Sequence, residues 1–182
     1  MISEAMQALY AGDRDRADSL LVPGRETVFE AAAFGLVARL DELLSEQPEL
    51  VRRWSEDGFT PLHLACFAGG AEATRLLVER GADLEALSGA SFAKVRPLGT
   101  AAFARDLESA AVLLEAGADP NGPGEGGLAP LHAAARNGDL DFVRLLLRHG
   151  ADATEAADDG RTPADLAGEA GHNEAAELLA PR

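Results

Sequence analysis

Several kinds of feature are scarce or missing in this chain of 182 residues, and each scarcity removes a class of protein. A single cysteine, Cys66, excludes an intrachain disulfide, so nothing in the sequence demands an oxidising compartment. No stretch approaches the ~20 apolar residues that a membrane helix requires. The N-terminus has neither the basic start nor the apolar core of a signal peptide. We therefore expect a cytoplasmic protein that makes no use of a membrane.

Basic and aromatic residues are also few. Lysine and arginine number 16 against 31 aspartate and glutamate residues, which gives a net charge of −15. Phosphate backbones repel such a chain, so we expect no nucleic-acid partner and favour basic proteins or cationic ligands. Solubility alone is the other explanation of the acidity. Aromatic residues make up 5% of the chain, so the core must be built from alanine and leucine, which suit closely packed helices.

A short segment that begins "TPLHLACFAGG" at Thr60 recurs along the chain. It is echoed by "RPLGTAAFARD", "APLHAAARNGD" and "TPADLAGEAGH", whose prolines are 36, 33 and 33 residues apart. A second marker, the triplet "GAD", recurs with spacings of 36 and 33 residues. Two markers that share one period indicate a repeated structural unit. The prolines are Pro61, Pro97, Pro130 and Pro163, and the glycines of the triplet are Gly81, Gly117 and Gly150.

Each unit has the pattern of two short helices. Thr60 and Thr162 are good N-cap residues, and the proline after each suits the first helical turn, where a missing N–H costs nothing. The first helices are expected to end near Gly69, Gly138 and Gly171. A second helix follows, as in "LDFVRLLLRH", whose apolar residues fall at helical spacing. One unit cannot bury its own apolar face, so we expect neighbouring units to stack.

This pattern resembles the ankyrin repeat family, whose 33-residue unit contains T-P-L-H-x-A. "TPLHLA" at 60–65 matches it outright, "APLHAA" at 129–134 lacks only the threonine, and the resemblance covers at least residues 28–182. It implies an all-α ankyrin-repeat solenoid of about five helix-turn-helix units with short hairpin-like connections. The predicted parts of this single domain are a degenerate N-terminal helical pair at 3–22, an N-terminal cap repeat at 23–54, internal repeats at 55–86, 87–122 and 123–154, and a C-terminal cap repeat at 155–182.

His63 and Cys66 raise the alternative of chemistry. In the ankyrin family the histidine of this motif, here His63 and His132, hydrogen-bonds across adjacent hairpins and holds them in register. Cys66 follows His63 at a spacing that can bring the two side chains together on a helix, but no oxyanion donor or orienting partner is visible. A zinc site needs three or four converging ligands, whereas His63 and His132 lie two units apart. We predict no catalysis, no metal and no cofactor; an enzyme or metal protein that uses these residues is the alternative.

The resemblance implies a protein–protein interaction module without catalysis, because partners of this family usually meet the hairpin tips and the concave groove of the inner helix face. We expect a monomer whose partner is a protein with an apolar spot rimmed by basic residues. An inhibitor or immunity-type regulator of an enzyme is the alternative. The predicted partner-binding residues are Glu56, Asp57, Phe59, Phe67, Phe92, Val95, Phe103, Leu128, Arg136, Asp158 and Arg161.

The third unit departs most from the repeat pattern. It has three extra residues, with Lys94 where the turn glycine belongs, Arg96 in place of threonine and Gly99 in place of histidine. Loss of the cap should cost on the order of 1 kcal/mol. Either this segment has been remodelled to touch a partner or it has drifted. We favour remodelling, with the 87–96 loop, including Phe92 and Val95, at the centre of the binding surface.

Overall fold

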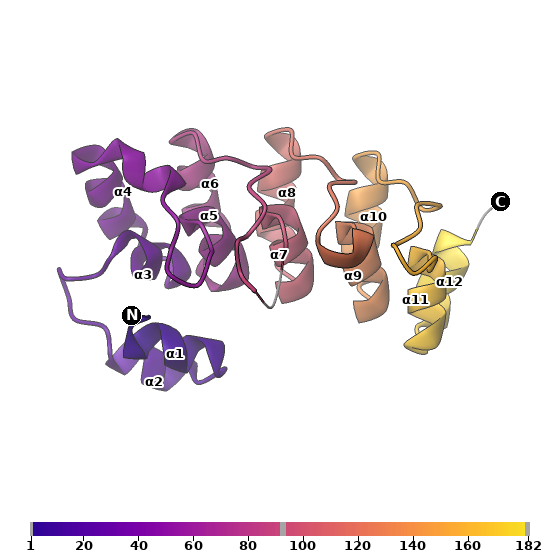
Figure 1. The fold of residues 1–182 in the computed structure, drawn as a ribbon, viewed down its shortest axis with the longest axis horizontal. Helices are drawn as coiled ribbons and strands as arrows, with labels where there is room; N and C mark the ends of the chain where they lie inside the picture. Colours follow the sequence, from indigo (N-terminus) through magenta and orange to yellow (C-terminus); the bar gives the residue numbers. More distant parts are fainter. Residues whose placement is uncertain (1, 92–93, 181–182) are drawn as a thin grey trace.

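Helix pairs stacked in a row make up most of the protein. The computed structural model describes residues 2–91 and 94–180, and these residues form helices and turns without a strand. Five of the pairs stand side by side in chain order (Figure 1). The predicted all-α solenoid of about five units is therefore confirmed. The pairs are α3 (Val28–Ala33) with α4 (Val37–Glu46); α5 (Pro61–Leu64), continued by a π turn (Ala65–Gly69), with α6 (Ala71–Glu79); α7 (Pro97–Ala104) with α8 (Leu107–Glu115); α9 (Pro130–Asn137) with α10 (Leu140–Arg148); and α11 (Pro163–Glu169) with α12 (Asn173–Leu179).

The first helices begin where the sequence predicts. The hydroxyl oxygens of Thr60 and Thr162 accept hydrogen bonds from the backbone N–H three residues further on, at 3.4 and 3.3 Å. Thr27 caps α3 in the same way, and the Glu30 carboxylate accepts a hydrogen bond from the Thr27 N–H at 2.8 Å. Proline is the first residue of α5, α7, α9 and α11. The caps and prolines thus fix the start of each unit.

The first helices also end alike. In each of the five stacked units a backbone N–H donates to the carbonyl oxygen five residues earlier, at 2.9 to 3.1 Å. This closure favours a residue in the left-handed conformation, which Gly138 and Gly171 provide with φ angles of 67° and 81°. Arg105 takes the same role with φ 61°. In the second unit the closure forms within the π turn that ends at Gly69.

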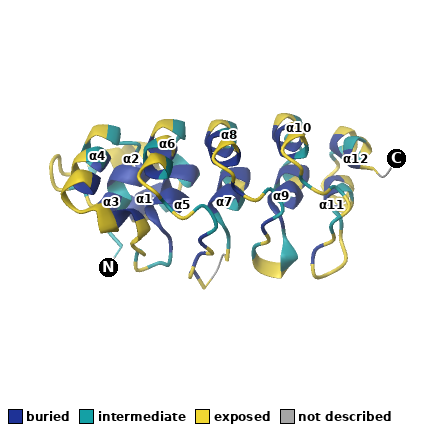
Figure 2. Cartoon of the chain, turned by 90° about the horizontal axis from the view of Figure 1, so that it is seen from above, coloured by how far each residue is buried: buried dark blue, intermediate teal, exposed yellow. Residues whose placement is uncertain are grey.

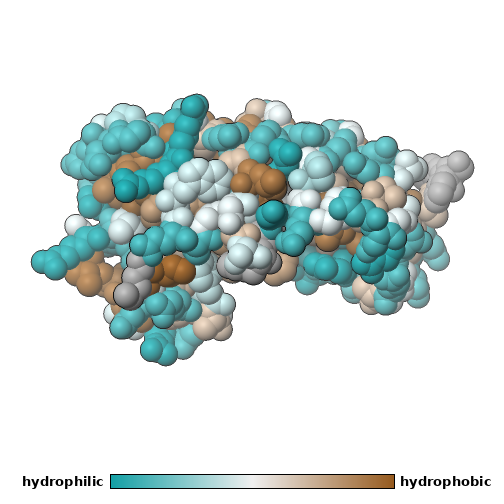
Figure 3. All heavy atoms as spheres, viewed as in Figure 1, coloured by the Kyte–Doolittle hydropathy of each residue, from teal (hydrophilic) through white to brown (hydrophobic). Residues whose placement is uncertain are grey.

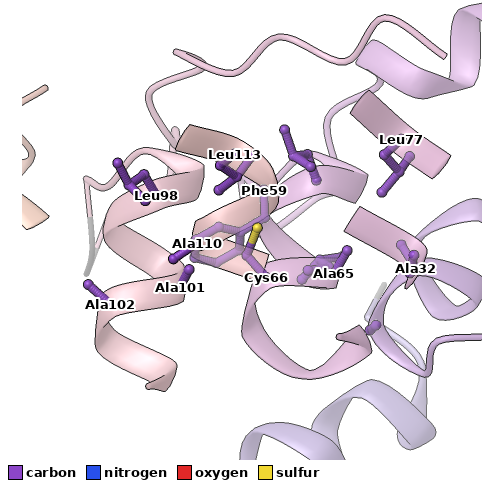
Figure 4. Packing of buried hydrophobic residues seen from close by; sticks show 14 of the residues in the cluster. Ala32, Phe59, Ala65, Cys66, Leu77, Leu98, Ala101, Ala102, Ala110 and Leu113 are labelled. Carbon is purple, nitrogen blue, oxygen red and sulfur yellow. The ribbon is translucent and has the colours of Figure 1, made fainter. Parts of the chain in front are cut away.

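Small side chains allow the units to pack closely. Cys66 and Ala101 are fully buried where the second and third units meet, and Ala65 is fully buried on the side of Ala32 in the first unit (Figure 4). The buried residues face the neighbouring helices, while the exposed ones cover the outside and the connections (Figure 2). The buried core therefore repeats with the same period as the sequence. One equivalent position in the second helix of each unit illustrates this. That position carries a buried leucine in every unit, namely Leu44, Leu77, Leu113, Leu146 and Leu179.

The connections between units form fingers that pair with one another. The Gly89 N–H donates to the Gly58 carbonyl oxygen at 2.8 Å, which joins the finger before α5 to the finger before α7. A similar bond of 2.7 Å joins the finger before α7 to the finger before α9. His63 Nε2 lies 2.9 Å from the carbonyl oxygen of Val95 on the next finger. His132 makes the same contact further along the row, at 3.3 Å. Both histidines therefore tie adjacent fingers together, as the family resemblance implies.

Arg96 anchors the finger before α7, which diverges from the repeat pattern. Its guanidinium donates to the carboxylate of Glu85 at 2.9 Å, to the carbonyl oxygen of Glu85 at 3.1 Å and to that of Pro123 at 3.2 Å. The Thr100 hydroxyl donates to the Arg96 carbonyl oxygen at 3.2 Å. Arg96 thus ties the finger to its own base at Glu85 and to the next finger at Pro123, although the helix lacks a threonine cap. The arginine at this position therefore has a structural explanation.

A sixth pair, α1 (Glu4–Tyr10) and α2 (Arg14–Ser19), does not continue the row. We call it the N-terminal hairpin. It lies against the first helices of the row, on the side that faces away from α4 and α6 (Figures 1 and 2). We call this side of the first helices the inner face. The helical pair expected at 3–22 thus lies on the inner face rather than in line with the repeats, and the predicted unit boundaries remain predictions.

Candidate functional site

An apolar cavity opens on the inner face beside the N-terminal hairpin. Its volume is about 450 Å³, and its walls come from the hairpin, the second unit and the third unit. On the face that carries the connections between units, the surface is mostly hydrophilic, and hydrophobic residues gather where the hairpin meets the row (Figure 3). The structure therefore brings together four of the predicted partner-binding residues. The lining consists of Tyr10, Phe59, His63, Leu64, Phe67, Val95, Thr100 and Phe103.

The three phenylalanines of this cavity differ in exposure. Phe103, on α7, is 62% exposed. Phe67 is partly buried, and its ring meets the edge of the Tyr10 ring with the centroids 5.9 Å apart. Phe59 is buried, with its ring centroid 5.8 Å from that of His63. Phe103 is thus the aromatic side chain with the most surface left to cover, while Phe59 forms the floor.

Gly99 gives the Val95 side chain its place in the cavity wall. A Cβ atom at Gly99 would lie 2.7 Å from Val95 Cγ2, closer than real Cβ contacts come. The equivalent position in the preceding unit is His63, which fills the space beside its own helix. Glycine at this position therefore leaves open the space that Val95 Cγ2 occupies. This departure from the repeat pattern shapes the cavity directly.

His63 acts as a buried crosslink. Its Nδ1 lies 2.8 Å from the Thr60 hydroxyl oxygen, and its Nε2 lies 2.9 Å from the Val95 carbonyl oxygen. Burial lowers the pKa of the imidazole from 6.5 to about 4, although the hydrogen bond to Val95 opposes this shift. The ring is therefore neutral at neutral pH. One ring nitrogen contacts the capping Thr60, and the other contacts Val95 on the next finger.

Cys66 lies in the core between units. Its Sγ is 3.9 Å from the Thr74 hydroxyl oxygen, which in turn lies 2.9 Å from that of Ser109. Burial raises the pKa of the thiol to about 12, so the sulfur is protonated at neutral pH and is a poor nucleophile. Within residues 2–91 and 94–180, no three His, Cys, Asp or Glu side chains converge as a metal site requires.

Two of the predicted finger residues lie beside the hairpin. The carboxylate of Asp57 accepts a hydrogen bond from the Tyr10 hydroxyl at 2.7 Å. Burial and this neighbouring carboxylate both raise the pKa of Tyr10. Glu56 borders a second cavity of about 290 Å³, whose wall includes Met6 of α1. These acidic residues thus contact or surround the hairpin.

The other predicted residues lie outside the lining of the apolar cavity. Leu128 is partly buried, and Arg136 and Asp158 are exposed. The Arg161 guanidinium donates to the carboxylates of Asp159 and Glu169, each at 2.9 Å, on the surface. These four are spread along the row and do not form one site with the cavity. Phe92 lies outside the described residues.

Sequence reasoning missed the contribution of the N-terminal hairpin. The Arg14 guanidinium lies over the Phe34 ring, 5.0 Å from its centroid. It also donates to the carbonyl oxygens of Phe34 and Ala68 at 3.3 Å each. The sequence feature that points to this different placement is the spacing of 23 residues from Gly12 to Gly35, which is too short for a full repeat. That spacing shows that the hairpin has no finger of its own to join the row.

Comparison with protein-family models bears on this architecture directly. The model described as "Ankyrin repeats (3 copies)" matches residues 3–123 and 98–182. The chain belongs to the ankyrin repeat family. A comparison with curated proteins gave no match. Ankyrin repeat proteins are generally protein–protein interaction modules and are typically not catalytic. In this ankyrin repeat protein, no helix of the described ranges is long and apolar enough to span a bilayer.

Proposed function

We propose that this ankyrin repeat protein binds a partner protein through the apolar cavity and the fingers beside it, without catalysing a reaction. The observation that supports the proposal most is Phe103, which is 62% exposed at the edge of a cavity whose other walls are mainly apolar. A large apolar side chain left in water gains about 1.5–3 kcal/mol when it is covered. Central apolar anchors of this kind commonly dominate protein interfaces.

The cavity also suggests the chemistry of the partner. A volume of about 450 Å³ falls in the range of ligand pockets and admits a large apolar side chain. The chain carries a net charge of −15, so an approaching basic surface is attracted. We therefore propose that the partner presents an apolar side chain surrounded by basic residues. The protein binds it as a monomer in the cytoplasm.

Replacing the exposed phenylalanine tests this function. We expect Phe103→Ser to weaken partner binding by about 10- to 100-fold, because the covered apolar surface is lost while little changes in the free protein. The measurement is affinity capture from a cell extract with the native chain and the variant, followed by mass spectrometry and titration of the captured protein. Val78→Ser is the matched control, since Val78 lies on the second helix α6, is partly buried and lies outside the cavity lining.

The proposal fails if the two variants retain the same proteins with the same affinity as the native chain. It also fails if Val78→Ser weakens binding as much as Phe103→Ser does. The unfolding midpoints of both variants are measured alongside, so that a loss of binding is not mistaken for a loss of fold.

A further inference from the structure

The N-terminal hairpin is attached to the repeats by a small apolar contact. Within α1 and α2, Met6 and Leu9 are the large buried side chains. The other buried residues of these helices are alanines, and α2 buries one of them. Each unit of the row is by comparison covered by helices of its neighbours. The hairpin therefore has much less apolar surface to hold it than a repeat has.

Polar contacts supply much of the attachment. The Tyr10 hydroxyl donates to the Asp57 carboxylate at 2.7 Å, and the Arg14 guanidinium donates to the carbonyl oxygens of Phe34 and Ala68. The Arg14 side chain is 45% exposed. Water can replace such bonds when the hairpin leaves, so they hold it in a defined place without fixing it permanently.

Two cavities lie along the same helix, α1. The apolar cavity of about 450 Å³ has Tyr10 in its wall, and the cavity of about 290 Å³ has Met6 and Trp54 in its wall. Protein interiors are normally packed with few voids larger than a water molecule. The seam between hairpin and row thus leaves two cavities along α1. This separates it from the close packing within the row.

The connection at 20–27 has the features of a hinge. Val22 is 56% exposed, Pro23 follows it, and Gly24 has a φ of 80°. A turn bond joins the Arg25 N–H to the Val22 carbonyl oxygen at 2.9 Å. A few residues of this kind at the end of an element can absorb a large change in backbone angles. The hairpin can therefore swing away while its other end stays tied to α3.

We propose that the N-terminal hairpin undocks from the inner face as a unit, by movement at 20–27. Undocking uncovers Phe34 and Phe67 and lengthens the apolar inner face by the first unit of the row. The hairpin is thus an internal occupant that limits how much of this face a partner reaches. This role in limiting partner access rests on the proposed binding function, whereas the undocking movement itself does not.

Hydrogen exchange of the full chain tests the movement without a partner. In the native chain we expect the amides of 4–19 to exchange together, at least about tenfold faster than those of α7 and α9. The double variant Tyr10→Phe/Arg14→Gln should raise the exchange rate of 4–19 by a further tenfold or so and leave α7 and α9 unchanged. Arg16→Gln is the matched control, because Arg16 is an exposed arginine of α2.

Fluorescence of Trp54, the sole tryptophan, separates undocking from fraying of the short helices. Trp54 borders the cavity beside Met6, so undocking changes its surroundings and shifts its emission to the red in the double variant. Three results would overturn the proposal. They are exchange of 4–19 at the same rate as the repeats, equal acceleration by Arg16→Gln, and faster exchange of 4–19 with no change in Trp54 emission. Because these measurements need no partner, they stand even if the proposed binding function fails.

Discussion

Replacing Gly69 with alanine is expected to lower the free energy of unfolding by about 2–3 kcal/mol. A Cβ atom at this position would lie 1.9 Å from the carbonyl oxygen of Ala32, on the neighbouring unit. Backbone atoms cannot rotate away as a side chain can, so the first two units must separate to make room. Chemical denaturation of the full chain measures the loss.

Gly168→Ala is the matched control for this prediction. Gly168 lies in α11, and a Cβ atom there would have no neighbour within 4 Å. Alanine favours a helix over glycine by up to about 1 kcal/mol, so this variant should be as stable as the native chain or more stable. A Gly69→Ala protein as stable as Gly168→Ala would show that the first two units do not pack backbone against backbone.

Acidification should destabilise the protein through His63. Burial lowers the pKa of His63 to about 4 in the folded chain, while in the unfolded chain the ring has its ordinary value of 6.5. Between these values the unfolded chain binds the proton and the folded chain does not, so stability falls as pH falls. A shift of this size corresponds to a loss of roughly 3 kcal/mol between pH 7 and pH 4. The contribution levels off as pH falls through the folded-state pKa, because both states then carry the proton.

The variant His63→Gln isolates this effect, because it cannot take up the proton. It should be less stable than the native chain at pH 7, since the bonds to Thr60 and Val95 are disturbed. Between pH 7 and pH 4 it should lose about 3 kcal/mol less than the native chain does. Denaturation curves across this range provide the comparison. Equal losses in the two proteins would mean that His63 is not the buried neutral group described here.

The stacked row could be predicted because the signals that define it are local. Threonine caps, prolines in the first turn and glycines at helix ends act within a few residues, and their period of about 33 residues follows from the stacking of equal units. His63 was correctly assigned as a crosslink between fingers, through the family motif. Local chemistry and tertiary structure agree in the units that carry these signals, whereas the first helix of the third unit has no side-chain cap at Arg96 and ends at Arg105 with φ 61°.

The inner face was harder to predict because it depends on contacts between distant residues. Phe59 lies in a finger, yet its ring turns inward onto His63 and is buried, which no local pattern reveals. The contact of Tyr10 with Asp57 joins residues 47 positions apart. The N-terminal hairpin resembles part of a repeat but lacks the finger that would place it in the row. Its position on the inner face therefore follows from tertiary packing alone.

The most direct test of the central claim is a map of backbone amide chemical shifts in the full chain as the captured partner is added. We predict that the largest changes fall on the inner face, at Phe67, Val95 and Phe103 and on the fingers beside them. Changes confined to the second helices α6, α8 and α10, with Phe103 unaffected, would contradict the account.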